Sequence, residues 1–152
     1  MQRAQPAGRI VVGVDGSQGS RAALRWAVGQ AELTDSSIEA VIAWTFPAAA
    51  AGFGLGPMVP EDSADFYEEL AAKHLQSAIT DSVEPGCEVE ITPAVRRGPA
   101  AEVLLDSAGG ADLLVLGSRG HGGFAAMLLG SVSQHCVRHA RCPVAIIREP
   151  TA

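Results

Sequence analysis

Short apolar runs alternate along the chain with longer segments in which apolar residues recur every three or four positions. Ile10-Val11-Val12 carries no charge toward either face, which is typical of a strand in a parallel sheet covered by helices. The predicted strands are Arg9–Val14, Ile38–Trp44, Val89–Val95, Leu113–Leu116 and Pro143–Ile147. The periodic segments predict helices from Ser20 to about Ala31, from Asp62 to about Asp81, over Pro99–Ala108 and over Ser131–Ala140. We expect Ser20 to cap the first helix.

This alternation of strand and helix predicts an α/β fold with a mainly parallel sheet and right-handed crossovers. The length of 152 residues favours a single domain that comprises residues 1–152, with its core at about 9–148. Residues 46–60 are rich in Gly, Pro and Ala. Such a composition is unsuited to regular structure, and we expect a flexible loop there that could serve as a lid.

Composition and charge exclude several classes of protein. The net charge of −6 argues against a nucleic-acid binder. A Walker A phosphate loop requires a glycine, then a lysine, then Ser or Thr. The single lysine, Lys73, stands between Ala72 and His74, so such a loop is excluded. No run of about 20 apolar residues predicts a membrane span. Three irregularly spaced cysteines and no signal-peptide pattern indicate a reduced, cytoplasmic protein.

Two glycine-rich positions follow the fourth predicted strand. The turn from Gly117 to Gly123 holds four glycines, and Gly130-Ser131 opens the last predicted helix. Backbone N–H groups in such a turn, together with those at a helix start, can hold a phosphate. The residues alone fit two ordinary turns that need glycine for their geometry equally well.

At these residues the chain resembles a known family. The spacing Gly117-x2-Gly120-x9-Gly130-Ser131 is similar to the ATP-binding signature of the universal stress protein family. The Val-Gly-Val-Asp15-Gly-Ser start and the Cys-Pro-Val lead into the last strand agree with it. The resemblance extends over about residues 9–148. One departure from the family pattern is Gly98-Pro99-Ala100, where the proline stands one place early. We expect this proline to affect the start of a helix and not the binding of the nucleotide.

The resemblance implies a Rossmann-like three-layer sandwich, with a five-stranded parallel sheet in the order 3-2-1-4-5 and helices on both faces. It implies that Asp15 lies near the adenosine, that Ala43 offers its backbone to the adenine, and that the glycines approach ribose and phosphates. Arg119 either pairs with a phosphate or is a solvated loop charge. The candidate nucleotide-binding residues are Asp15, Ala43, Gly117, Arg119, Gly120, Gly130, Ser131, Val132 and Ser133.

The function implied by the resemblance is that of an ATP-binding, nucleotide-responsive regulator of stress or dormancy. Its partner would be an adenine nucleotide, with Mg²⁺ or Mn²⁺ as a possible companion, and it would form a homodimer through residues 144–147. We identify no catalytic residue, so hydrolysis of ATP should be slow at most. Two alternatives stay open: a small nucleotide hydrolase or nucleotidyl transferase, and an interaction protein that binds no nucleotide.

Histidines and cysteines near the C-terminus invite a metal hypothesis. His135 and His139 are four residues apart on one expected helical face, with Cys136 and Cys142 nearby. The glutamate of a His-Glu-x-x-His zinc motif is absent. We favour a helix that packs on the sheet over a metal site, and we interpret His121 as a loop residue.

Overall fold

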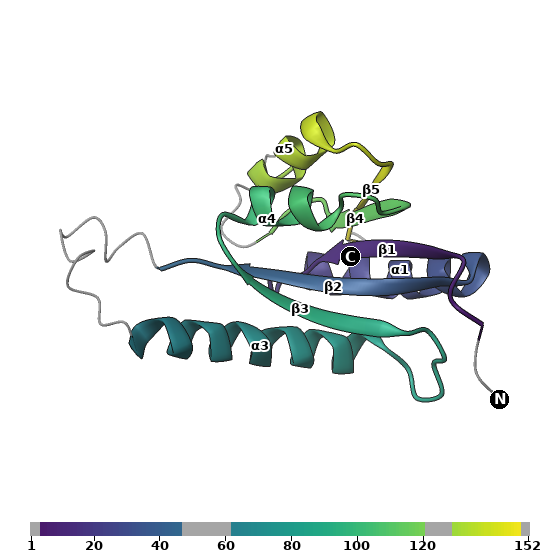
Figure 1. The fold of residues 1–152 in the computed structure, drawn as a ribbon, viewed down its shortest axis with the longest axis horizontal. Coiled ribbons are helices and arrows are strands. Elements are labelled where there is room, and N and C mark those ends of the chain that lie inside the picture. The colour runs from purple at the N-terminus through teal and green to yellow at the C-terminus, as the bar shows by residue number, and fades with distance from the viewer. Residues whose placement is uncertain (1–3, 47–61, 121–128, 150–152) are drawn as a thin grey trace.

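The computed structural model describes residues 4–46, 62–120 and 129–149 (Figure 1). Its strands are β1 (Gly8–Gly13), β2 (Ser36–Trp44), β3 (Ile91–Arg97), β4 (Leu113–Gly117) and β5 (Val144–Ile147). Its helices are α1 (Gln18–Thr34), α3 (Asp62–Ser82), α4 (Ala100–Ser107) and α5 (Ser131–His139). The strands form one parallel sheet in the order β3-β2-β1-β4-β5, which confirms the expected fold.

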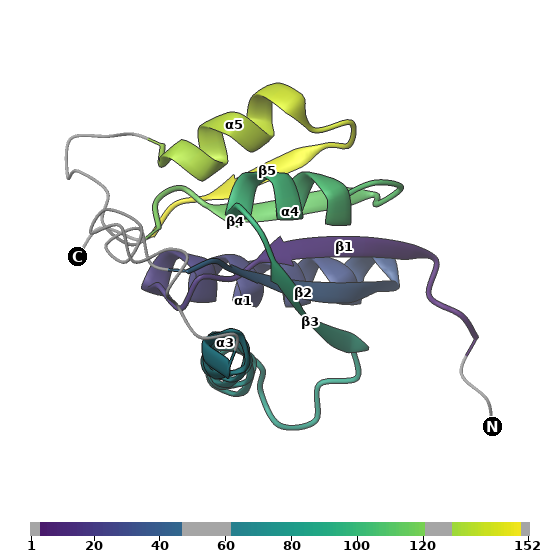
Figure 2. The same ribbon diagram turned by 60° about the vertical axis from the view of Figure 1, so that its left-hand side comes forward.

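Helices cover the sheet in two pairs, with α1 and α3 on one face and α4 and α5 on the other (Figures 1 and 2). The pattern of β1 explains both layers, because alternate side chains of a strand point to opposite faces. Ile10 and Val12 enter the core under α1 and α3, while Val11 enters the core under α4 and α5. All three are at most 2% exposed, so β1 is apolar on both sides because both sides are covered.

The first helix begins earlier than expected, and its cap is Ser17, not Ser20. The Ser17 side chain accepts a hydrogen bond from the Ser20 N–H at 3.2 Å. Ser20 lies inside the first turn, where its hydroxyl donates to the Ser17 carbonyl at 3.0 Å. The chain turns sharply before the helix because Gly16 has a φ of 84°, a conformation that glycine adopts readily. The short turn leaves Ser17 at the cap position.

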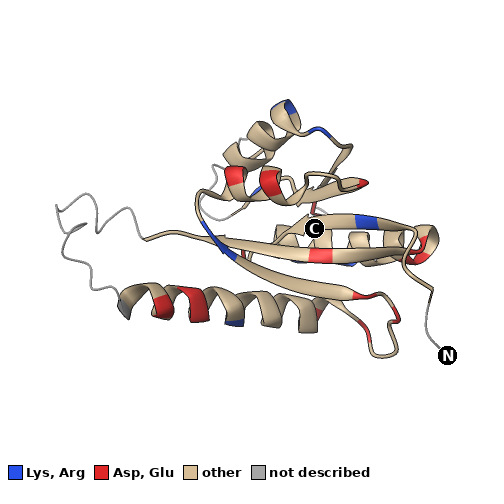
Figure 3. Cartoon of the chain, viewed as in Figure 1, with Lys and Arg blue, Asp and Glu red and all other residues tan. Residues whose placement is uncertain are grey.

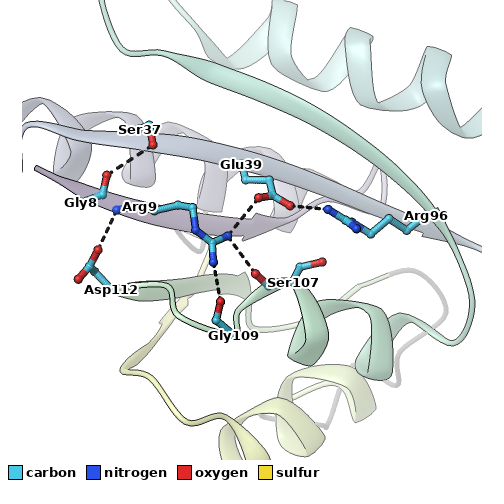
Figure 4. Close-up of polar contacts among 8 residues, drawn as sticks. All are labelled: Gly8, Arg9, Ser37, Glu39, Arg96, Ser107, Gly109 and Asp112. Carbon is cyan, nitrogen blue, oxygen red and sulfur yellow. Dashed lines mark hydrogen bonds and ion pairs between the residues drawn. The ribbon is translucent and has the colours of Figure 1, made fainter. Parts of the chain in front are cut away.

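Arg9 joins three elements on the α4 side of the sheet (Figure 4). Its guanidinium pairs with Glu39 of β2 at 3.1 Å and donates to the carbonyls of Ser107 and Gly109, at 3.0 and 2.7 Å. These two carbonyls lie at the C-terminal end of α4, where a cation complements the helix dipole. Arg96 of β3 bonds the other oxygen of Glu39 at 2.9 Å. The network ties β1, β2, β3 and α4 together.

An aromatic cluster extends from the end of β2 to α3. Trp44 stacks on Tyr67 with ring centroids 6.5 Å apart, and Phe46 meets both rings edge-on at 5.8 Å. The guanidinium carbon of Arg97 lies 4.7 Å from the Phe46 ring and 5.4 Å from the Trp44 ring, within the range of cation–π attraction. This cluster anchors the end of β2, where the chain leaves the sheet.

The two edge strands of the sheet differ. β3 carries Pro93 at its centre, and the pairing of Glu90 and Gly98 with β2 places the backbone groups of residue 93 on the outer side. The outer edge of β3 therefore lacks one hydrogen-bond donor, a usual way of blunting a sheet edge. β5, by contrast, consists of four half-buried apolar residues.

Acidic residues mark α3 and α4, while basic residues are scattered over β1, β3 and the end of α5 (Figure 3). No helix among the described residues is both long and apolar enough to cross a membrane. Residues 47–60 of the expected lid loop lie outside the described residues, as does His121.

Candidate functional site

A pocket of about 460 Å³ opens beyond the carboxyl ends of β1, β2 and β4. This volume lies within the range of small-molecule sites. The strand order reverses between β1 and β4, and parallel α/β sheets bind their ligands at such a point. All nine candidate residues line this pocket, namely Asp15, Ala43, Gly117, Arg119, Gly120, Gly130, Ser131, Val132 and Ser133.

The turn after β1 fixes the position of the Asp15 carboxylate. Oδ1 of Asp15 accepts hydrogen bonds from both the N–H and the hydroxyl of Ser17, the former at 2.9 Å. The Asp15 N–H donates to the Ser20 hydroxyl at 3.3 Å. Arg21 donates to the carbonyl of Gly16 and pairs with Asp81 of α3 at 3.5 Å. The side chain of Asp15 is therefore held at the start of α1, with Oδ2 turned toward the glycine-rich turn.

The signature glycines differ in what a side chain would meet at each position. A Cβ on Gly117 would lie 2.8–2.9 Å from the backbone of Gly19, so the end of β4 needs glycine in order to pack on α1. A Cβ on Gly120 would collide with Oδ2 of Asp15. A Cβ on Gly130 would meet its nearest neighbours at an ordinary 3.6 Å. Backbone packing therefore explains Gly117, whereas Gly120 faces the tip of one side chain and Gly130 has ordinary space.

The start of α5 offers backbone donors to the pocket. The N–H of Gly130 bonds the carbonyl of Ser118 at 2.7 Å, and the N–H of Gln134 makes the first helical bond, to the carbonyl of Gly130 at 3.0 Å. The three N–H groups between them have no partner within the described ranges, and no side chain caps α5. These N–H groups belong to Ser131, Val132 and Ser133. Such a helix start carries partial positive charge and favours an anion.

The two serines of this first turn have different surroundings. Ser131 is exposed at the pocket, whereas Ser133 is 5% exposed and donates its hydroxyl hydrogen to the carbonyl of Gly117 at 2.7 Å. The Ser133 hydroxyl thus joins the start of α5 to the end of β4. Its proton is already used, so Ser133 can offer a pocket ligand its N–H group but not its hydroxyl hydrogen.

The opposite wall of the pocket is apolar, and the sequence did not reveal it. Val41, Leu104 and Leu116 are buried there, and Ala100 lines the same wall at the start of α4. Val14 donates to the carbonyl of Val41 at 2.8 Å. Because backbone groups of residues two apart in a strand point the same way, Ala43 presents its N–H and carbonyl beyond the end of β1.

The remaining lining residues that we did not single out are Gly13, Val14, Ser17 and Ser20. Their position at or just beyond the end of the first predicted strand was the available signal, since ligands bind at strand carboxyl ends. Ala100 and Leu104 carried no such signal, because only the folded arrangement brings α4 over β2. The early proline, Pro99, is the N-terminal cap residue of α4 and directly precedes Ala100, so the departure from the family pattern lies beside the pocket.

The pocket is equipped for binding more clearly than for covalent chemistry. Within the described part of the chain, Asp15 and Arg119 are the charged side chains that line it, and both are exposed. The described lining contains no histidine or cysteine that could act as a base or nucleophile beside the serines. Cys136, on the buried side of α5, is a core residue, and burial raises the pKa of its thiol.

The four side chains of the metal hypothesis do not come together in one site. His135 and His139 are both exposed, whereas Cys136 is fully buried. No group of three or more His, Cys, Asp or Glu side chains in the described part of the chain could hold a metal ion together. The helix α5 packs on the sheet, as expected, through Cys136 and Val132.

Comparison with known proteins supplies independent information. The sequence profile of the universal stress protein family matches residues 6–148. Universal stress protein Rv2623 of Mycobacterium tuberculosis is 34% identical over 146 residues, which span 92% of this chain and 47% of that protein. The chain therefore spans about half the length of the curated relatives it matches.

Comparison with solved structures agrees with the family match. The hypothetical protein MJ0577 superposes with a TM-score of 0.78 over 95% of this chain and 98% of its own, at 16% identity, and so shares the fold. A universal stress protein solved in complex with cAMP is 25% identical and has a TM-score of 0.59, covering 95% of this chain and 98% of its own. From the profile match over most of the chain and the relatives above 30% identity, we conclude that this chain belongs to the universal stress protein family.

Proposed function

We propose that the chain binds an adenine nucleotide, ATP in the first instance, in the pocket beyond β1, β2 and β4. The observation that carries this proposal is the convergence of all nine candidate residues on one pocket. Residues from 15 to 133 come together there, although they are far apart in the sequence. The relative solved with cAMP supports the choice of an adenine nucleotide.

The two walls of the pocket suit the two ends of such a ligand. The apolar wall of Val41, Leu104 and Leu116 would take the adenine, with backbone groups of Ala43 in reach of its ring nitrogens. The polar wall would take ribose and phosphates, with Asp15 toward the ribose and the start of α5 toward the phosphates. Neutral donors and the helix dipole replace the lysine of a Walker A loop.

Part of the triphosphate charge would need a further counter-charge. A divalent ion such as Mg²⁺ or Mn²⁺ coordinated by the phosphates would supply it, since such ions bind through substrate phosphates with few protein ligands. Arg119, exposed in the glycine-rich turn, would supply another positive charge. With no dedicated base in the described lining, we expect hydrolysis to be slow at most.

The output would be regulatory, in a reduced, cytoplasmic setting in which the three cysteines stay free thiols, as they are in the structure. Nucleotide binding would shift the populations of conformations that the pocket-lining turns adopt, and with them the surface that contacts partners. The protein would act as a homodimer joined through β5, whose apolar edge would otherwise be exposed.

A titration of nucleotide-stripped protein with ATP, followed by product analysis, tests the proposal. We expect saturable binding by calorimetry, with one site per chain, and little ADP after prolonged incubation. Rapid multiple turnover would instead favour a nucleotide hydrolase or transferase. Absence of saturable binding for ATP, AMP and cAMP alike would leave an interaction protein whose glycine signature serves only the fold.

The two serines at the start of α5 provide a matched pair of variants. Ser131→Ala removes an exposed hydroxyl from the pocket and should weaken ATP binding while leaving the free energy of unfolding within about 0.5 kcal/mol. Ser133→Ala removes the bond to Gly117 and should cost about 1 kcal/mol of stability. Calorimetric titration and urea unfolding of both variants separate these effects. Equal ATP affinity in Ser131→Ala and the parent protein would contradict the proposed phosphate contact.

A further inference from the structure

The rings of His135 and His139 form a pair on the exposed surface of α5. Their centroids are 4.5 Å apart and their planes are tilted by 42°. Both side chains are exposed, and neither belongs to the core under α4 and α5. The packing of α5 therefore does not explain why two imidazoles stand together there, and they do not line the nucleotide pocket.

The spacing of the two rings matches that of ligands on one metal ion. A metal–nitrogen bond of about 2.05 Å, with the ring centre about 1.15 Å beyond the nitrogen, places each centroid about 3.2 Å from the ion. Two such rings at a right angle about the ion would have centroids about 4.5 Å apart, and tetrahedral ligands about 5.2 Å. The observed 4.5 Å corresponds to the right angle.

We propose that His135 and His139 chelate a late divalent transition-metal ion of the Cu²⁺ or Ni²⁺ class. Imidazole is a preferred ligand of these ions, and right-angle ligation by nitrogen and oxygen is typical of them. With no third protein ligand in the described ranges, water completes the coordination. Hard cations such as Mg²⁺ prefer oxygen ligands and would not bind this pair.

Charges near the pair have opposing effects. The pair lies in the second half of α5, where the helix dipole favours a cation. Arg138 and Arg141 are exposed close by in the sequence and repel one. The affinity should therefore be moderate, and Arg138→Gln should increase it.

Titration of nucleotide-free protein with Ni²⁺ tests the proposal. Ni²⁺ is preferred as the probe because free thiols reduce Cu²⁺, and Cys87 and Cys142 are partly accessible free thiols. We expect one Ni²⁺ per chain, a rise in the melting temperature on binding, and a loss of affinity of about tenfold or more in either His135→Ala or His139→Ala.

His74→Ala is the matched control, because His74 is an exposed histidine on α3 away from the pair. This variant should bind Ni²⁺ like the parent protein. Unchanged Ni²⁺ affinity in His135→Ala and His139→Ala, or an equal loss in His74→Ala, would overturn the proposal. Neither result bears on nucleotide binding, which is measured separately with ATP in the absence of Ni²⁺.

Discussion

The three signature glycines differ in what surrounds them in the folded chain. Gly117 and Gly120 both belong to the family signature, but a side chain at either position would meet another part of the protein itself. Only at Gly130 does the fold leave ordinary space for a Cβ. A signature residue that the fold does not require is the one whose substitution reports most directly on the ligand.

Gly117→Ala and Gly130→Ala should therefore separate folding from binding. The first places a methyl group against the backbone of Gly19 and should cost about 1–3 kcal/mol of stability. The second, at the N-cap of α5, should cost at most about 1 kcal/mol of stability. Its methyl group would narrow the pocket, however, and should weaken ATP binding. Urea unfolding and calorimetry measure both quantities. A folded Gly130→Ala variant with unchanged ATP affinity would remove Gly130 from the site.

Arg9 offers a second test at this scale. Arg9→Ala removes the ion pair with Glu39 and two bonds to carbonyls at the end of α4, so it should cost about 1–3 kcal/mol. Arg96→Ala, the control, breaks one bond from a side chain that is 51% exposed and should cost about 1 kcal/mol at most. Thermal unfolding of both variants shows whether Arg9 contributes more to stability than Arg96 does. Equal destabilisation would contradict the central place of Arg9.

At the scale of elements, the site is made where strands end and helices begin. The turn after β1 joins a strand to α1 through Ser17, which caps the helix and also bonds Asp15. The start of α5 is joined to the end of β4 through Ser133. Each junction therefore links the stability of a helix start to the position of a pocket residue.

The cap of α1 can be tested by substitution. Ser17→Ala removes the acceptor for the Ser20 N–H and should cost about 1 kcal/mol, or about 2–4 °C in melting temperature. Ser17→Asn supplies another favourable cap and should retain most of the stability. Calorimetric scans of the two variants provide the measurement. If both lose the same stability, the cap bond is not what holds this helix start.

Sequence reasoning identified every helix and strand of the described residues and most of the polar wall of the pocket, for a physical reason. In a parallel sheet all strand carboxyl ends lie at one edge, so residues after strands are expected to meet. Ala100 and Leu104 were missed because helix periodicity shows which side of α4 is buried but not which strand it covers. Ser20 was predicted as the cap of the first helix, but the cap is Ser17, which directly follows the turn at Gly16.

At the scale of the whole molecule, the sheet has one blunted and one open edge. Pro93 removes a donor from the outer side of β3, whereas β5 presents a short apolar edge with no such device. In β5, Pro143 and Ile147 point their carbonyls toward β4, so the backbone groups of Val144 face outward. This difference supports the proposed homodimer through β5 and disfavours one through β3.

Val144→Pro would give β5 the feature that β3 already has. Its N–H is not needed for pairing with β4, so the variant should keep its fold but lose the outward donor. We expect the parent protein to be a dimer by light scattering and the variant to be largely monomeric. Circular dichroism and thermal unfolding establish that the variant is folded. A folded Val144→Pro variant that remains dimeric would place the interface elsewhere.

The aromatic cluster at the end of β2 has a spectroscopic consequence. Of the two tryptophans, Trp26 is 40% exposed on α1, whereas Trp44 is stacked on Tyr67 beneath the guanidinium of Arg97. The neighbour of Trp44 in the strand, Ala43, lines the pocket. A Trp26→Phe protein would thus carry a single tryptophan, one residue from the proposed adenine site, and the emission of that tryptophan would follow occupancy without any added label.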